Sequence, residues 1–329
     1  MASKLELTVA CGGYEIVRAL EDGTVRADGI DLVMLTGMGS RERHWRLARR
    51  LEFDVCEMNV GAYFMARDRG LPITAIPVFL HRRFRHGFIF VNTRAGIETP
   101  RDLIGKRVGS TNFQPAGNIW IRGILEEHYG VPHQAITWVV ERSEDVEFEP
   151  PPGLRIEKAP EGQSLDALLA EGELPAMISP TVPRPFVDGD PRVARLFPDY
   201  KAIELEYFRQ TGIFPIMHVT VVKQAIVDRY PWVATNLVQA FEQAKQAAYR
   251  RVANPRMVPL AWMRTAWEEE RALLGPDPWE YGLSETNRRN LATILRYTRQ
   301  QGLISREPAL DELFVDTDLG DAAGAEENV

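Results

Sequence analysis

Residues 97–109 read IETPRDLIGKRVG, and this stretch decides the fold because it joins a helix start, a helix stop and a strand start. Thr99 is typical of a helix N-cap, Pro100 suits the first helical position, and Asp102 lies in the first turn, where a carboxylate is favoured. Gly105 is expected to end the helix, and a short strand is expected directly after it. The stretch therefore predicts the beginning of a new α/β unit.

Strands and helices alternate on both sides of this stretch. Before it, strands are expected at residues 5–10, 30–35, 53–58, 73–80 and 88–91, and helices at residues 14–20, 41–51 and 60–66. From residue 107 onward, strands are expected at residues 107–110, 136–140, 176–179 and 216–222, and helices at residues 118–129, 165–169, 232–251 and 287–301. This alternation predicts α/β architecture, with mostly parallel sheets covered by helices on both faces.

Two such units joined at two places would form a two-lobed clamp. The first crossing is expected near residues 91–94 and the return near residues 212–216, so the second lobe is inserted into the first. Residues 1–92 and 213–329 would form lobe 1, with an acidic tail from about residue 315, and residues 93–212 would form lobe 2. Ligands of open α/β sheets bind beyond the carboxyl ends of the strands, and clefts between domains are preferred sites.

The charge distribution limits the partners of this chain. The formal net charge is -7, but residues 311–329 contain seven Asp and Glu and no Lys or Arg, so the rest of the chain is neutral. A neutral body offers no basic field for a nucleic acid. The sequence has no apolar run long enough to span a membrane and no secretory signal, which favours a cytoplasmic protein. A homo-oligomer is possible.

The densest polar signal is the segment HRRFRH, residues 81–86, between two apolar strands. In an extended segment Arg83 and Arg85 face one way, whereas Arg82 and His86 face the other. At least one of these pairs is expected to face the cleft, where a guanidinium can bind a carboxylate through two hydrogen bonds. The alternative is a solvated basic loop.

A second polar segment, residues 109–118, precedes an expected helix. The free N–H groups at a helix start favour an anion. Four residues add side-chain donors, namely Ser110, Thr111, Gln114 and Asn118. The alternative, which is compatible with anion binding, is that Asn118 simply caps the helix.

Single polar residues after other strands are weaker candidates. Tyr14 and Asn59 follow the first and third strands, where each could donate to a ligand or cap a helix. Ser179 follows a strand of the second lobe and could line the cleft mouth. His218 lies in an apolar strand, where a buried core histidine is the alternative. His44, His128 and His133 are expected to be structural. The two cysteines and six histidines form no metal-binding motif, and no dinucleotide, Walker A or G-x-S-x-G motif is present.

Several of these segments resemble a known family. Residues 97–109 resemble the start of the second lobe in type II periplasmic binding proteins. The segments RRFRH (82–86), GIFPIMH (212–218) and DPWEYG (277–282), with the final ELF (312–314), resemble 4,5-dihydroxyphthalate decarboxylases over nearly the whole chain. The resemblance implies a binding-protein fold that became a cytoplasmic enzyme without an organic cofactor.

The resemblance also implies a reaction, the conversion of 4,5-dihydroxyphthalate to 3,4-dihydroxybenzoate and CO2. Its small anionic aromatic substrate requires fixed cations, an acid that protonates the ring, and a partner that polarises the hydroxyl para to the leaving carboxylate. His86 and His218 are the candidates for the last two roles, which remain unassigned between them. The alternatives are a non-catalytic solute-binding protein and a decarboxylase of another hydroxylated aromatic acid.

Overall fold

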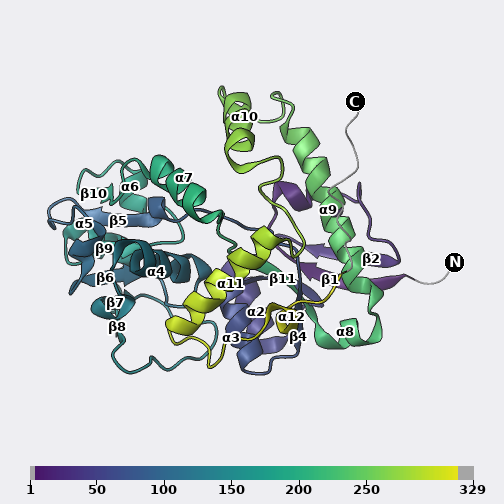
Figure 1. Ribbon diagram of the computed structural model, residues 1–329, viewed down its shortest axis with the longest axis horizontal. Coiled ribbons are helices and arrows are strands. Elements are labelled where there is room, and N and C mark those ends of the chain that lie inside the picture. Colours follow the sequence, from purple (N-terminus) through teal and green to yellow (C-terminus); the bar gives the residue numbers. More distant parts are fainter. Residues whose placement is uncertain (1–3, 318–329) are drawn as a thin grey trace.

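The first lobe is built on a five-stranded sheet with the strand order β2-β1-β3-β11-β4. The computed structural model describes residues 4–317 and shows two lobes, each with its own sheet (Figure 1). The strands of the first sheet are β1 (Leu5–Ala10), β2 (Ile30–Leu35), β3 (Val55–Asn59), β4 (Ile73–Ile76) and β11 (His218–Lys223). Strand β11 enters from the far end of the chain and pairs antiparallel with both β3 and β4.

The second lobe contains a six-stranded sheet with the order β10-β5-β9-β6-β7-β8. Its strands are β5 (Ile89–Asn92), β6 (Arg107–Ser110), β7 (Thr137–Val140), β8 (Arg155–Lys158), β9 (Ala176–Ile178) and β10 (Val193–Arg195). Because β5 pairs with β9 and β10, it belongs to this lobe, and the predicted crossing near residues 91–94 is wrong. The chain crosses earlier, between β4 and β5. There it runs beside the returning segment, since Arg83 N donates to Pro215 O and Met217 N donates to His81 O.

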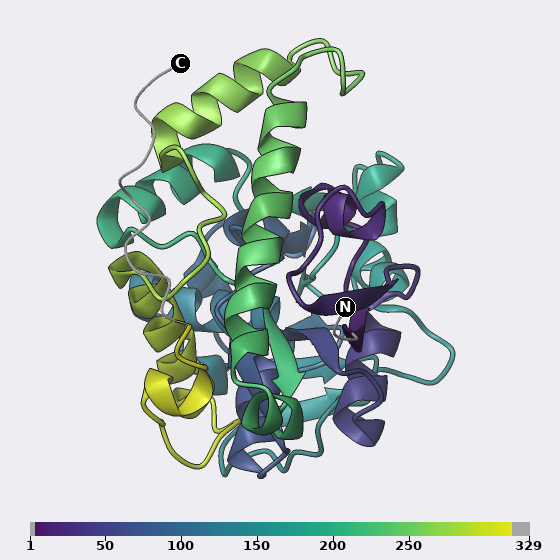
Figure 2. The same cartoon turned by 90° about the vertical axis from the view of Figure 1, so that its right-hand side faces the viewer.

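Helices cover both sheets. Those of the first lobe are η1 (Glu15–Val17), α1 (Arg18–Glu21), α2 (Ser40–Arg50), α3 (Val60–Asp68), α8 (Gln224–Arg229), α9 (Trp232–Val252), α10 (Met263–Leu274), α11 (Glu285–Gln300) and α12 (Leu310–Leu313). Those of the second lobe are η2 (His86–Phe88), η3 (Pro100–Leu103), α4 (Ala116–Tyr129), η4 (His133–Ala135), α5 (Leu165–Glu171), α6 (Arg184–Val187) and α7 (Tyr200–Thr211). Figure 2 shows α9 beside the N-terminal segment of the chain, where it packs on η1 and α1.

Residues 97–109, from which the start of a new α/β unit was predicted, fold with a shorter helical element than expected. The helix predicted after Thr99 is a single 3₁₀ turn, η3, in which the Asp102 carboxylate accepts from the backbone N–H groups of Glu98 and Thr99. Gly105 has a φ of 75°, a left-handed conformation that suits glycine, and strand β6 follows. The cap and the glycine therefore direct the chain into the second sheet.

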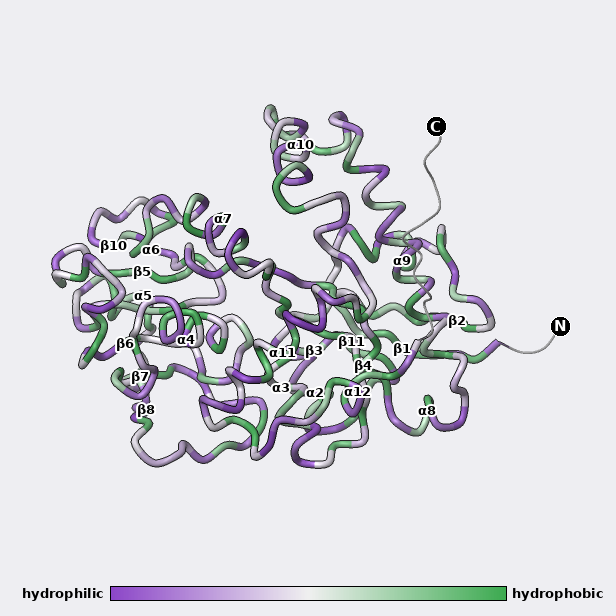
Figure 3. The backbone as a smooth tube through the Cα atoms, viewed as in Figure 1, coloured by the Kyte–Doolittle hydropathy of each residue, from purple (hydrophilic) through white to green (hydrophobic). Residues whose placement is uncertain are grey.

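The core of each lobe is formed by its strands together with the helices that pack on them, as Trp120 of α4 and Leu237 of α9 show. Hydrophobic and hydrophilic stretches alternate along the whole chain in Figure 3. Cys56 in β3 and Cys11 just after β1 are buried free thiols. Between the lobes, α4 packs on α11, and the buried Trp120 indole donates to Ile216 O at 2.9 Å. Within residues 4–317 no helix is both long and apolar enough to cross a membrane. Most of the predicted acidic tail, residues 318–329, lies outside the described residues.

Candidate active site

A cleft of about 690 Å³ lies between the lobes. The first lobe and the crossing segments contribute Tyr14, Asn59, His81, Arg82, Arg83, Phe84, Arg85, Phe214, Met217, His218 and Trp279 to its lining, and the second lobe contributes Phe88, Pro115, Gly117, Pro180, Thr181, Tyr200 and Glu204. The cleft therefore brings together the basic segment, the return segment and the start of α4.

Arg85 is the main buried cation of the cleft. The residue is 3% exposed, and its guanidinium contacts the Met217 thioether sulfur at 2.8 and 3.1 Å. Among residues 4–317, no carboxylate lies within ion-pair distance of it. Burial, followed by the charge of Arg83, lowers the pKa of Arg85 to about 9, so it remains protonated at neutral pH. A thioether is a weak acceptor, so this desolvated cation is suited to binding an anion.

The start of α4 is shaped to accommodate Arg85. A Cβ at Gly117 would lie 2.7 Å from the Arg85 Cζ, so only glycine fits at this position without displacing the guanidinium. The neighbouring Ala116 N–H donates to the Asn59 side-chain oxygen at 3.1 Å, and the same oxygen caps α3 through Gly61 N. Asn59 therefore lines the cleft and also links the two lobes.

A second feature of the cleft is a histidine held by a buried carboxylate. His218 Nδ1 lies 2.5 Å from Glu57 Oε1, which also accepts from the Tyr14 hydroxyl at 2.8 Å. Glu57 Oε2 accepts from Arg43 Nη2 at 2.6 Å and from Gly12 N at 2.8 Å. Burial alone would raise the pKa of Glu57, but His218 and Arg43 outweigh it and hold the pKa well below its usual range. An ionised Glu57 orients His218 with Nδ1–H toward the carboxylate and leaves Nε2 for the cleft.

Two further histidines pack edge-on against the His218 ring. His81 lines the cleft with its ring centroid 4.8 Å from that of His218, and His44 lies behind at 5.1 Å. Burial and the nearby His218 and Arg85 charges lower the pKa of His81 to about 2, so its imidazole is neutral. His81, Glu57 and Arg43 are not among the site residues predicted from the sequence. A lone carboxylate inside an apolar strand was the signal that could have indicated Glu57.

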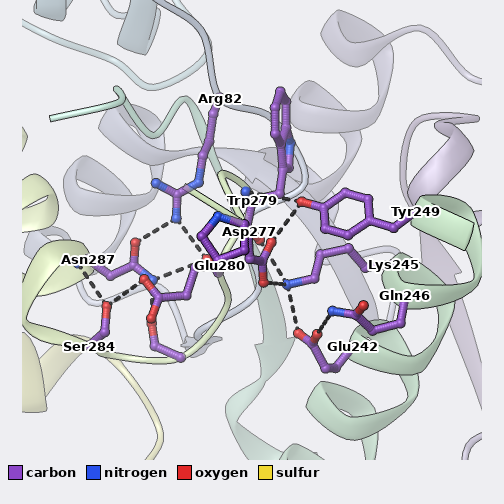
Figure 4. Close-up of polar contacts among 12 residues, drawn as sticks. Arg82, Glu242, Lys245, Gln246, Tyr249, Asp277, Trp279, Glu280, Ser284 and Asn287 are labelled. Carbon is purple, nitrogen blue, oxygen red and sulfur yellow. Dashed lines mark hydrogen bonds and ion pairs between the residues drawn. The ribbon is translucent and has the colours of Figure 1, made fainter. Parts of the chain in front are cut away.

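Arg82 also lines the cleft, but its guanidinium is occupied by protein acceptors and is not free for the predicted role in binding. Its guanidinium donates to Phe214 O at 3.3 Å, Glu280 O at 2.8 Å and Asn287 Oδ1 at 2.6 Å. Figure 4 shows Arg82 on one side of the segment that carries Trp279, and Lys245 of α9 with Asp277 on the other. Arg82 therefore fixes the loop that places Trp279 in the cleft wall.

This position leads to a stability prediction. Arg82→Met is expected to lower the free energy of unfolding by about 2–4 kcal/mol, because two buried acceptors and one part-buried acceptor lose a charged donor. Affinity of the folded variant for phthalate should change by less than about twofold, since the guanidinium is occupied by the protein. Urea unfolding and calorimetric titration would measure the two effects. Normal stability with lost affinity would show that Arg82 contacts the ligand.

His86, by contrast, lies outside the cleft. The catalytic role predicted for it is therefore wrong. Its buried ring packs among Tyr129, Phe197 and Tyr207, at centroid distances of 6.2, 5.7 and 5.3 Å. Burial lowers the pKa of His86 to about 4, which keeps the ring neutral in this aromatic environment. The physical reason is that the extended segment ends at Arg85, and the 3₁₀ turn η2 directs His86 into the aromatic interior of the second lobe.

The polar side chains before α4 are used within the second lobe and not in the cleft. Asn118 donates to Ser110 Oγ and Asn112 O, and Gln114 pairs with the backbone of Val146. The Thr111 hydroxyl contacts only the neighbouring Asn112 side chain, at 3.4 Å. These four predicted contacts are therefore corrected. Asn118 is not the helix cap either, because α4 begins at Ala116 after Pro115.

Of the remaining candidates, Tyr14 and Arg83 line the cleft, whereas Ser179 does not. Ser179 is buried and its hydroxyl accepts from Thr181 N at 3.2 Å, so Thr181 lines the cleft in place of Ser179. Tyr14 lines the cleft while its hydroxyl donates to Glu57; burial first, and then this contact, raises its pKa above the usual value. Arg83 is exposed at the cleft, with its guanidinium 5.4 Å from the centre of the Phe88 ring.

Aromatic rings complete the wall of the cleft. Phe214 lies between Phe84 and Trp279, with ring centroids 4.8 and 5.1 Å apart. A flat ligand can pack against such a wall while its carboxylate reaches Arg85. Among residues 4–317, no group of three or more His, Cys, Asp or Glu side chains is arranged to hold a metal ion.

The fold has known counterparts among solute-binding proteins. The periplasmic aliphatic sulphonate binding protein SsuA from Escherichia coli covers 100% of this chain and 97% of its own, with a TM-score of 0.55 at 13% identity. The alkanesulfonate-binding protein SsuA from Xanthomonas axonopodis pv. citri bound to MOPS gives a TM-score of 0.56 at 13% identity, over 95% of this chain and 98% of its own. These likenesses show the periplasmic-binding-protein fold.

Sequence comparisons give the family. Residues 15–147 match the NMT1/THI5 like family model. A 4,5-dihydroxyphthalate decarboxylase from Comamonas testosteroni is 36% identical over 321 residues, which cover 95% of this chain and 97% of that protein. One from Pseudomonas putida is 36% identical over 214 residues, which cover 63% of this chain and 83% of that protein. With its interlobe cleft and binding-protein fold, the chain belongs to the 4,5-dihydroxyphthalate decarboxylase family of carboxy-lyases.

Proposed function

We propose that the chain decarboxylates 4,5-dihydroxyphthalate to 3,4-dihydroxybenzoate and CO2 without a cofactor. The observation that carries this proposal is that His218, oriented by Glu57, lines the same cleft as the unpaired cation Arg85. A binding protein needs the cation and the closing lobes. It has no need of a carboxylate–histidine pair aimed at the ligand, whereas an enzyme that transfers a proton does.

In the proposed reaction, Arg85 and the exposed Arg83 bind the carboxylates and the ring packs on the aromatic wall. Protonated His218 delivers its Nε2 proton to the ring carbon that bears the leaving carboxylate, and the para hydroxyl oxygen takes up the positive charge. Neutral His81 accepts a hydrogen bond from that hydroxyl. The carbon–carbon bond then breaks, its electron pair restores the aromatic ring, and CO2 leaves. Glu57 stabilises the imidazolium before transfer, and solvent returns the proton to His218.

Incubation with 4,5-dihydroxyphthalate tests this function. Equal amounts of CO2 and 3,4-dihydroxybenzoate, identified by mass, are expected. Tight binding without CO2 release would instead indicate that the chain is a solute-binding protein. Release of CO2 from other hydroxylated aromatic acids alone would correct the substrate, and a panel of such acids compared by product mass would identify it.

A further inference from the structure

Glu204 is a buried carboxyl group of the cleft that the proposed mechanism leaves unused. It lies on α7 of the second lobe, is 9% exposed, and lines both the cleft and a second hollow of about 260 Å³ between α7 and α10. Its Oε1 accepts from Gly87 N at 3.0 Å. Within the described part of the chain, no Lys, Arg or His lies within ion-pair distance of this carboxyl, which is unusual for a buried acid.

Charged groups of both signs surround Glu204 at longer range. Arg85 approaches from the crossing segment and Arg195 from β10, and both favour the carboxylate. Across the second hollow, α10 presents Glu269 and Glu270, and Lys201 of α7 is paired with Glu269 at 2.7 Å. Neutral His86 lies beside Gly87. Burial raises the pKa of Glu204 to about 7, against the backbone hydrogen bonds of Gly87 and His86 and the charges of Arg195 and Arg85.

We propose that Glu204 takes up a proton when an aromatic dicarboxylate enters the cleft and then donates a hydrogen bond to one of its carboxylates. This inference rests on the proposed function for the class of ligand. Two negative charges next to an ionised Glu204 would repel it in a poorly hydrated site, whereas the protonated acid provides a donor from the lobe opposite His218. The cleft would thus match a dianion with Arg85, Arg83 and one neutral acid.

The sign of the pH dependence follows from this arrangement. Below pH 7 Glu204 is already protonated in the free protein, and binding requires no proton. Above pH 7 the free carboxyl is ionised, and binding must take up a proton, so affinity falls as pH rises. If the bound form stays protonated, phthalate binding should weaken about tenfold between pH 6 and pH 8, with uptake of about half a proton at pH 7.

Calorimetric titration with phthalate in buffers of different ionisation enthalpy tests the proposal. Phthalate has no ring hydroxyl, so it binds without reacting by the proposed route. Glu204→Gln keeps a neutral donor, so its affinity should not change with pH and should exceed that of the wild type about tenfold at pH 8. Glu206→Gln, an exposed change on the same helix, should behave like the wild type. Benzoate, with one carboxylate, should bind without proton uptake at pH 8.

The outcomes separate this inference from the proposed function. A flat pH profile in the wild type, an equal slope in Glu204→Gln, or no phthalate binding would overturn the role of Glu204, even in a protein that releases CO2 from 4,5-dihydroxyphthalate. A tenfold slope that Glu204→Gln removes, in a protein that releases no CO2, would overturn the decarboxylation and leave the role of Glu204 in place.

Discussion

His218→Gln is expected to lower kcat for 4,5-dihydroxyphthalate by about 10²- to 10⁴-fold, the usual contribution of a positioned acid. Glutamine can occupy much of the imidazole volume and can still donate to Glu57, but it cannot deliver a proton to a ring carbon. KM should change by less than about threefold, because the cations and the aromatic wall are untouched. Steady-state CO2 release with both constants resolved would measure the effect.

His86→Gln is the matched control, because it changes a second buried histidine of the neighbouring segment that does not line the cleft. Its kcat should stay within about threefold of the wild type, and any loss should be in stability, since an aromatic environment is disturbed. Equal loss of kcat in both variants would contradict the assignment of His218 as the donor. A large loss in His86→Gln alone would restore the role that the sequence predicted for His86.

The sequence indicated where the site lies better than which side chains form it. Turns after strands are recognisable from local chemistry, and the cleft is lined by Tyr14, Asn59, residues 81–85 and three residues of the return segment, Phe214, Met217 and His218. The alternation predicted for residues 82–86 fails at Arg85, whose ψ of -7° leads into the 3₁₀ turn η2, so Arg82 and His86 pack in different lobes. Alternation also cannot tell which side chains of residues 81–85 line the cleft, because that depends on how the returning segment, residues 212–218, packs beside them.

The missed residues depend on contacts between distant segments. Glu57 is a site residue because β11 brings His218 beside β3, a pairing over 161 residues that no local pattern encodes. Conversely, Ser110, Gln114 and Asn118 seemed ideal anion donors by composition, yet a buried loop must satisfy its own polar groups first. Glu204 lies on helix α7, for which the sequence predicted no helix, and no motif marks it.

Arg85→Gln should weaken phthalate binding about 100-fold or more and raise KM for the substrate similarly, because a desolvated cation interacts strongly with a carboxylate. Its folding should be little affected, since the guanidinium contacts a thioether and a carbonyl at 3.5 Å and has no ion pair to lose. Calorimetry with phthalate and urea unfolding would measure the two quantities. Arg83→Gln is the exposed counterpart, and its effect should be only about threefold because solvent screens its charge.

Gly117→Ala provides an independent test of the same contact without removing the charge. Its new Cβ would lie 2.7 Å from Arg85 Cζ and would push the guanidinium out of position, so phthalate affinity should fall although every ionisable group is retained. Because His218 and Glu57 lie in the other lobe, kcat at saturating substrate should fall much less than kcat/KM. Normal affinity in both Gly117→Ala and Arg85→Gln would mean that the dianion is bound elsewhere, since the Arg82 guanidinium is occupied by Phe214 O, Glu280 O and Asn287 Oδ1 and Arg83 is exposed.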